Sequence, residues 1–245
     1  MHGKLSPDTT TDKKVMGRHR LNLPAIEASL RAVQAEFPRI NAGLSASRDP
    51  LTDEVMSNML AGYRHVDVCL DSGYDLFGPG ASPHLLELNR LVLCGEQDSR
   101  PRAEVARQLK SAEQHFYSTE GGGVGGLMEW LELHRKDKIW KRAAGLFTWV
   151  LSQPQLYLEG NHRTGALLMS YLLVRQGRPP FVLTVENARH FFEPASLIKK
   201  HKKHGLDTLL ALPKLTRKFA HLLEEQADAG FLVNDRIGSE ALLEY

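Results

Sequence analysis

The chain has little of several features that mark common protein classes. Its 245 residues include only two cysteines, Cys69 and Cys94, which excludes a disulfide framework, and their apolar helical contexts are typical of reduced core thiols. None of the 11 histidines forms an H-x-x-x-H or H-E-x-x-H spacing, which argues against a zinc enzyme. There is no run of about eighteen apolar residues and no signal-type segment near Met1, so we expect a cytoplasmic protein without a membrane partner.

Neither sign of charge is in excess. The 31 basic and 29 acidic residues give a net charge of +2, so composition supplies no broad electrostatic attraction for nucleic acid. A basic run occurs at residues 199–204, but no aromatic residues interleave with it, and a solvated helix face explains it better than contacts with a phosphate backbone. We therefore expect no nucleic-acid partner.

Strand-like segments are scarce. Hydrophobic residues make up 42% of the chain, enough for one large domain with a substantial core. Helical patterns begin at Pro24, Pro50, Pro83 and Pro101, and Pro180–Thr184 is the one strand-like run of more than a few residues. The sequence therefore predicts an all-α fold with a small β-hairpin.

The predicted domain organisation is simple. Residues 1–20 are polar and cannot bury enough apolar surface to offset chain entropy, so we expect a disordered N-terminal tail. Residues 21–245 then form a single helical domain, with a core at about residues 82–183 in which the helices at 137–151 and 166–174 pack together. A C-terminal helical extension at 184–245 is either additional packing or a partner surface.

The most informative segment is the sequence YLEGNHRTG at residues 157–165. A long apolar helical run follows it and stops at Gly177, so Gly160 and Asn161 are expected to cap the start of that helix. The first N–H groups of a helix lack internal partners, and an anion placed there would meet them together with the guanidinium of Arg163. A plain turn in which Arg163 pairs with Glu159 explains the same residues.

This segment resembles the signature of the Fic (Fido) family, which reads H-x-F-x-(D/E)-G-N-(G/K)-R-x-x-R. Glu159, Gly160, Asn161 and Arg163 match that pattern, and Tyr157 stands at the aromatic position. The resemblance implies a Fic-like helical bundle with a small β-hairpin flap. It also implies transfer of a nucleotidyl or phosphate-linked group from a nucleotide such as ATP to a protein hydroxyl.

The resemblance further implies the roles of the site residues. Glu159 holds Mg²⁺ against phosphate oxygens, a role that suits a single carboxylate. The phosphate-binding residues are Gly160, Asn161, His162 and Arg163. Of these, His162 occupies the Gly or Lys position and is ambiguous: it donates to the anion, caps the helix, or acts as an acid or base if it turns inward.

Two further positions depart from the family pattern. Gln155 stands where the family has its catalytic histidine, and a carboxamide does not titrate near neutral pH, so it positions a hydroxyl or water but cannot act as the general base. Losing one positioned base typically lowers the rate about 10²–10⁴-fold. Ala166 replaces the second arginine of the pattern, so we expect a shorter or differently placed anion.

The segment Ser57–Gly62 has the frame of the family's inhibitory helix, (S/T)-x-x-x-E-(G/N), with Ala61 in place of the glutamate. In the family that glutamate pairs with the second arginine, which is also missing here. Losing both partners together is physically coherent, because one of them buried alone would cost about 3–5 kcal/mol. An ordinary core helix without a regulatory origin explains the frame as well.

A glycine-rich bend lies within residues 117–131, where the resemblance places a flap over the active site. An exposed flap edge near Gly121–Gly126 would recruit a protein target through main-chain hydrogen bonds. The five glycines among these six residues are equally typical of a plain flexible loop. No predicted strand precedes this glycine-rich segment, so it is not a dinucleotide or P-loop fingerprint.

Two functions follow from the sequence. The first is a divergent nucleotidyl- or phospho-group transferase in which ordinary adenylylation is slow or absent because Gln155 replaces the histidine. The alternative is a catalytically silent Fic-fold pseudoenzyme that acts as a binding or regulatory module. The sequence leaves the donor, the target protein, catalytic activity and the oligomeric state open.

Overall fold

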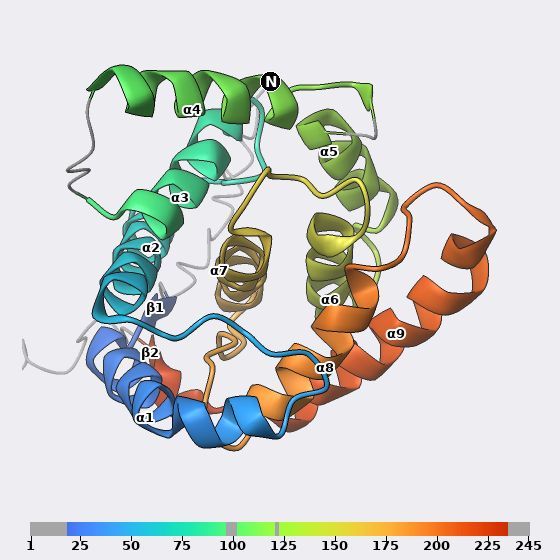
Figure 1. Ribbon diagram of the computed structural model, residues 1–245. Coiled ribbons are helices and arrows are strands. Elements are labelled where there is room, and N and C mark those ends of the chain that lie inside the picture. Colours follow the sequence, from blue (N-terminus) through green and yellow to red (C-terminus); the bar gives the residue numbers. More distant parts are fainter. Residues whose placement is uncertain (1–18, 97–101, 121–122, 235–245) are drawn as a thin grey trace, which may run out of the picture.

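The computed structural model describes residues 19–96, 102–120 and 123–234. These residues form nine α-helices, and a pair of three-residue strands joins the two ends of the described chain (Figure 1). The helices are α1 (Leu23–Ala42), α2 (Asp53–Ser72), α3 (Ser82–Cys94), α4 (Arg102–Phe116), α5 (Gly123–Leu133), α6 (Ile139–Leu151), α7 (Asn161–Val174), α8 (Ala188–Ile198) and α9 (Leu206–Glu225).

Helix α7 lies at the centre of the bundle, and Figure 1 shows it nearly end-on with α2 and α3 on one side and α6 on the other. Every residue from Thr164 to Val174 is buried. A helix that is apolar on all sides must be surrounded by other elements, and α2, α3 and α6 all contact it. The predicted packing of the helices at 137–151 and 166–174 is confirmed as the α6–α7 contact.

The helix boundaries follow local capping chemistry. Pro24 stands in the first turn of α1, and Gly95 and Gly177, both with positive φ, follow α3 and α7 as predicted stops. Helix α2 begins three residues later than Pro50, because the hydroxyl of Thr52 accepts a hydrogen bond from the backbone N–H of Val55 at 3.2 Å and caps the helix there.

The all-α class with a small antiparallel sheet is confirmed, but the strands are not where the sequence predicted them. Strand β1 (His19–Leu21) pairs with β2 (Leu232–Asn234), so the sheet is not a hairpin. Residues 19 and 20, predicted as tail, belong to β1, where the guanidinium of Arg20 donates to Asp67 in α2 at 2.9 Å. The rest of the predicted tail, residues 1–18, lies outside the described residues.

The predicted strand at Pro180–Thr184 is an irregular segment. Its backbone groups are paired with side chains rather than with a second strand. The carbonyl of Phe181 accepts hydrogen bonds from the hydroxyls of Tyr63, at 3.0 Å, and Ser170, at 2.8 Å. The Asn187 side chain donates to the carbonyl of Val182 at 2.8 Å. Such side-chain partners satisfy the same backbone groups that a ladder would.

The predicted flap is also wrong where the structure describes it. Gly123–Gly126 begin helix α5, and Gly121 and Gly122 lie outside the described residues. Glycine is a poor helix former, but Val124, Leu127 and Leu131 are buried here, and this tertiary packing outweighs local propensity.

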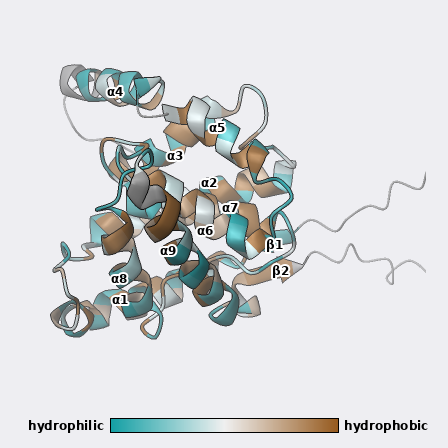
Figure 2. Ribbon diagram, turned by 90° about the vertical axis from the view of Figure 1, so that its right-hand side faces the viewer, coloured by the Kyte–Doolittle hydropathy of each residue, from teal (hydrophilic) through white to brown (hydrophobic). Residues whose placement is uncertain are grey.

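The core continues beyond residue 183 into the C-terminal helices. The ring of Phe219 in α9 stacks on Phe147 of α6 with centroids 4.9 Å apart, and Phe191 of α8 lies 4.6 Å from Phe181. Figure 2 shows the apolar residues gathered toward the centre and α4 coloured mainly as hydrophilic. Among the described helices, none combines the length and the apolar character that crossing a bilayer requires.

Candidate functional site

We call residues 157–163, which lead into the first turn of α7, the bend. It is held in place by a close approach between Gly160 and α3. Gly160 has a φ of 75°, and a Cβ at this position would lie 2.9 Å from Nδ2 of Asn89. Only glycine suits both conditions. The Asn89 amide donates to the carbonyl of Glu159 at 3.0 Å and to the hydroxyl of Thr164 at 2.9 Å, so one side chain spans the bend.

Asn161, predicted to bind phosphate, is buried and pairs with the backbone of Tyr157. Its Oδ1 accepts from the Tyr157 N–H at 2.9 Å, and its Nδ2 donates to the Tyr157 carbonyl at 2.8 Å. The Tyr157 ring is itself buried, stacks on Phe116 with centroids 5.3 Å apart and donates its hydroxyl to the carbonyl of Leu85. Asn161 and Tyr157 thus fix the shape of the loop, and the Asn161 amide is already used.

Arg163, the predicted guanidinium ligand, extends toward the end of α3. Its Nη1 donates to the carbonyl of Val92 at 2.8 Å, in the last turn of α3, where carbonyls lack helical partners. Burial lowers the pKa of Arg163, and the nearby carboxylates of Glu159 and Asp49 oppose that change. Within the described chain one of its five N–H donors is used in this way.

His162 is surrounded by cations. Its Nε2 lies 3.4 Å from Nη1 of Arg48. Burial, followed by the charges of Arg48, Lys199 and Arg163 in that order, lowers the pKa of His162 to about 3. Because arginine only donates, Nε2 accepts and the proton of the neutral ring is on Nδ1. His162 is therefore a neutral donor near pH 7, and without an anion beside it, it is a poor acid or base.

Arg48 is the functional candidate that the sequence did not reveal. It lies in the loop between α1 and α2 and reaches α8, where its Nη2 donates to the carbonyl of Phe192 at 3.2 Å and to the hydroxyl of Ser196. Its guanidinium carbon lies 5.3 Å from the centroid of the Phe192 ring. Its Nε is buried and has no hydrogen-bond partner among the described residues. A buried donor without a partner is costly, so it marks a place where an acceptor would be favourable.

We call the three cations Arg48, Arg163 and Lys199, together with the neutral His162 that they surround, the cation cluster. Its members come from the α1–α2 loop, the first turn of α7 and the end of α8. The backbone N–H groups of residues 161–163, at the positive end of α7, also find no partner among the described residues. Asp49 and Glu193 offset part of the charge at Arg48. The arrangement favours a bound anion that contacts several of these donors.

Sequence reasoning placed Lys199 on a solvated helix face, and its side chain is indeed exposed. What the sequence did not reveal is that this face lies beside the bend. Arg48 and His162 are separated by 114 residues, and neither residue carries a motif that links it to the other. The only local signal was the basic character of each segment.

Glu159 is exposed and lies close enough to Arg163 to oppose part of the lowering of that residue's pKa by burial. The described residues contain no group of three His, Cys, Asp or Glu side chains suited to a metal ion. Magnesium is commonly held by one or two carboxylates together with phosphate oxygens and water. Glu159 therefore fits Mg²⁺ as one ligand when a phosphate supplies others.

Gln155 is turned toward helix α6. Its Nε2 donates to the carbonyl of Leu151 at 3.2 Å, so its carboxamide caps the end of that helix. Its backbone carbonyl accepts a hydrogen bond from Nε2 of His115 at 3.0 Å, which leaves Nδ1 as the acceptor of a neutral His115 ring. The fold thus brings an imidazole from α4 to the backbone of Gln155, although the sequence gave no sign of it.

A cavity of about 580 Å³ adjoins the bend. It lies between α3, α4 and the loop before α7, and its walls include Leu86, Asn89, Leu93, Leu109, Leu158 and Glu159. Glu159 belongs to the bend and Asn89 of α3 contacts it, so a ligand in the cavity would lie next to Gly160. The volume is within the range of small-molecule sites.

The segment Ser57–Gly62, compared above with an inhibitory helix, lies in α2 and packs directly on α7. Ala61 is buried, and a Cβ on Gly62 would lie 2.4 Å from Cδ1 of Leu167. This close approach gives Gly62 a packing role. The relation of this segment to the family's inhibitory helix stays a prediction.

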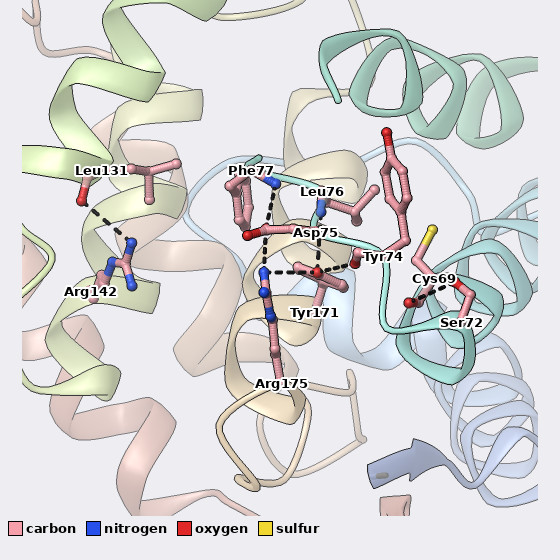
Figure 3. A network of polar contacts seen from close by, with 10 residues as sticks. All are labelled: Cys69, Ser72, Tyr74, Asp75, Leu76, Phe77, Leu131, Arg142, Tyr171 and Arg175. Atoms are coloured by element: carbon pink, nitrogen blue, oxygen red, sulfur yellow. Dashed lines mark hydrogen bonds and ion pairs between the residues drawn. The ribbon is translucent and has the colours of Figure 1, made fainter. Parts of the chain in front are cut away.

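The opposite end of α7 carries a different polar network (Figure 3). The Tyr171 hydroxyl donates to the carbonyl of Tyr74 at 2.6 Å and accepts from the N–H of Leu76 at 3.1 Å. Arg175 donates to the same hydroxyl at 3.3 Å and forms an ion pair with Asp75. Each charge here has a counter-charge, so this network is structural.

Comparisons of the chain with protein-family models, with curated proteins and with solved structures give no match. The resemblance to the Fic family therefore rests on the residues of the bend.

Proposed function

We propose that this protein binds a phosphate-containing ligand, such as a nucleotide, at the bend before α7, and that it is a divergent Fic-like nucleotidyl- or phospho-group transferase acting on a protein hydroxyl in the cytoplasm. Ordinary adenylylation would be slow or absent, because Gln155 cannot take up the proton of the attacking hydroxyl. The bend would bind the phosphate, and the adjoining cavity would hold the rest of the ligand.

The observation that carries this proposal is the cation cluster at the start of α7, a few residues after the two, Leu158 and Glu159, that line the cavity. A phosphate there would accept from Nε of Arg48, from Nδ1 of His162 and from the first N–H groups of α7. These donors come from two parts of the fold, the α1–α2 loop and the first turn of α7, and the fold already holds them near one another.

The residues of the bend would act mainly by positioning and by neutralising charge. Glu159 would hold Mg²⁺, which, when bound, offsets the negative charge of the phosphate oxygens. His115 is the imidazole that the fold brings to Gln155, and its Nδ1 is the acceptor we assign to the proton of the target hydroxyl. Asn161 and Asn89 would keep the bend in shape.

A second candidate function is a pseudoenzyme that binds the same ligand without transferring any part of it. Two observations favour it. The carboxamide of Gln155 is engaged with the carbonyl of Leu151, and the guanidinium of Arg163 donates to the carbonyl of Val92. Both residues would have to exchange these contacts before they could act on a substrate.

Binding is tested first by thermal unfolding with pyrophosphate, ADP or ATP, each with and without Mg²⁺. A ligand at about 100 times its Kd should stabilise the folded state by roughly 2.7 kcal/mol. We expect that gain to be lost in Arg48→Gln and kept in Arg64→Gln, since Arg64 is an exposed cation paired with Glu96. Equal stabilisation of both variants, or none in the native protein, would refute the proposed site.

Transfer is tested by incubating the protein with labelled nucleotides and cell extract. The transferase proposal expects labelled protein with the native chain and far less with Arg163→Ala or His115→Gln. Binding without labelling by the native chain would favour the pseudoenzyme, especially if Gln155→His creates labelling. Equal labelling by the native chain and Arg163→Ala would show that the bend takes no part.

A further inference from the structure

A second cavity, of about 540 Å³, lies on the other side of α6 from α7, between α5, α6 and α9. Its walls include two indole rings, of Trp130 and Trp149, together with Leu212 and the paired hydroxyls of Thr148 and Thr216, which are 3.0 Å apart. None of these residues belongs to the bend. The cavity is therefore a separate place for a ligand, and nothing in the proposed function uses it.

Lys203 lines this cavity and is only 8% exposed. Its Nζ lies 3.8 Å from the centroid of the Trp149 ring and donates to the carbonyl of Pro154. Within the described chain no carboxylate forms an ion pair with it. A buried lysine without a counter-charge is uncommon, because desolvation disfavours its charged form.

The backbone fixes the position of this amine. The N–H of Lys203 donates to the carbonyl of Gln153 at 2.7 Å, and the N–H of Gln153 donates to the carbonyl of His201 at 2.8 Å. The segment before α9 is thereby held against the segment after α6. Lys203 therefore lies on a segment whose backbone is hydrogen-bonded to the chain that follows α6.

The other charged groups of the cavity wall leave the amine without a neutralising partner. Lys141 is paired with Asp137 at 3.0 Å, and His134 stacks on Trp130 with centroids 4.2 Å apart. The remaining titratable residues of the wall are His204 and Arg217. Burial lowers the pKa of Lys203 to about 7, so a large share of the amine is neutral and nucleophilic near pH 7.

We propose that Lys203 is a covalent binding site for an aromatic aldehyde that carries an acidic group. The lone pair of Nζ adds to the carbonyl carbon, the amine nitrogen loses its protons to the departing oxygen, and that oxygen leaves as water when the C=N bond forms. Imine formation from an amine and an aldehyde needs neither an oxidant nor a reductant.

The walls of the cavity select this class of ligand. Two indoles offer flat apolar surface to an aromatic ring, and the guanidinium of Arg217 and the ring N–H of His204 offer hydrogen-bond donors to an acid. A protonated imine keeps one N–H for the Pro154 carbonyl and keeps a positive charge over the Trp149 ring. The contacts that hold the free amine are thus compatible with the product.

The experiment uses the full chain, 4-formylbenzoate and cyanoborohydride, which reduces the imine to a stable secondary amine. Peptide mapping by mass spectrometry then gives the rate at each lysine. We expect Lys203 to be modified at least about ten times faster than exposed Lys202 at pH 7, since only an amine with a lowered pKa is largely neutral there. The rate at Lys203 should saturate with aldehyde concentration.

Two variants complete the test. Lys203→Arg keeps a donor for the Pro154 carbonyl and a cation near Trp149 but forms no imine, so it should fold and lose the fast modification. Thr216→Phe narrows the cavity and leaves the amine in place, so it should slow the modification of Lys203. Modification of Lys203 no faster than of Lys202, a rate linear in aldehyde, or full-speed modification in Thr216→Phe would each overturn the proposal.

Discussion

The two ends of helix α7 differ in how their charged side chains are paired. At the C-terminal end Tyr171, Arg175 and Asp75 form a network in which each charge has a counter-charge (Figure 3). At the N-terminal end the cations Arg48, Arg163 and Lys199 lie near the neutral ring of His162, and the described chain leaves Nε of Arg48 without a partner. A satisfied network stabilises a fold, whereas a cluster of like charges destabilises it. The phosphate ligand that we propose would supply the opposite charge.

The largest effect should come from the part of the N-terminal end that is structural. Asn161→Ala removes both hydrogen bonds to the Tyr157 backbone, and each buried group left unpaired costs about 1–3 kcal/mol. We expect the free energy of unfolding in urea to fall by about 2–4 kcal/mol. Leu158→Ala, in the same loop but exposed, should change it by less than about 0.5 kcal/mol. Similar losses in the two variants would mean that the bend is not held by Asn161.

The next effect belongs to the C-terminal end. Tyr171→Phe leaves the N–H of Leu76 and the carbonyl of Tyr74 without the shared hydroxyl, and should lower the free energy of unfolding by about 1–3 kcal/mol. Ser72→Ala is a suitable control, because the carbonyl of Cys69 still accepts from the N–H of Tyr74. The gain in melting temperature with pyrophosphate should be the same in Tyr171→Phe as in the native protein. Loss of that gain would erase the distinction between the two ends.

The smallest effect should be a pH dependence at the cation cluster. The pKa of His162 is lowered from 6.5 to about 3 in the folded state, so below pH 6.5 the unfolded chain binds a proton that the folded chain does not. This contribution to stability is present above pH 6.5 and is lost progressively as the pH falls toward 3. His162→Gln should therefore flatten the fall in unfolding free energy between pH 7 and 5.

Sulfate sharpens this measurement, because it does not titrate in that range. A bound dianion would raise the pKa of His162, so the stabilisation by sulfate should increase from pH 7 to pH 5 in the native protein and not in His162→Gln. Identical pH profiles of the two proteins, with and without sulfate, would show that the cluster does not hold an anion through His162.

Much of the fold could be predicted because its signals are local. Gly95 and Gly177 end helices as expected, and the apolar run of α7 correctly indicated a core helix that packs against α6. The sheet could not be predicted, because β1 and β2 pair across nearly the whole chain and each has only three residues. The flap was wrong because the glycines of α5 were judged by propensity, while burial of Val124 and Leu127 decided their conformation.

The candidate site, like the fold, has one part that local sequence determines and another that long-range packing determines. The sequence by itself determined the bend, because a left-handed Gly160 followed by a long apolar helix is set by backbone sterics and periodicity over a few residues. Only the tertiary structure decided what surrounds the bend. It directs Asn161 and Arg163 to backbone carbonyls and brings Arg48 and Lys199 to His162. Electrostatic interaction depends on distance in space, and no pattern along the chain records which distant side chains the packing of α7 brings together.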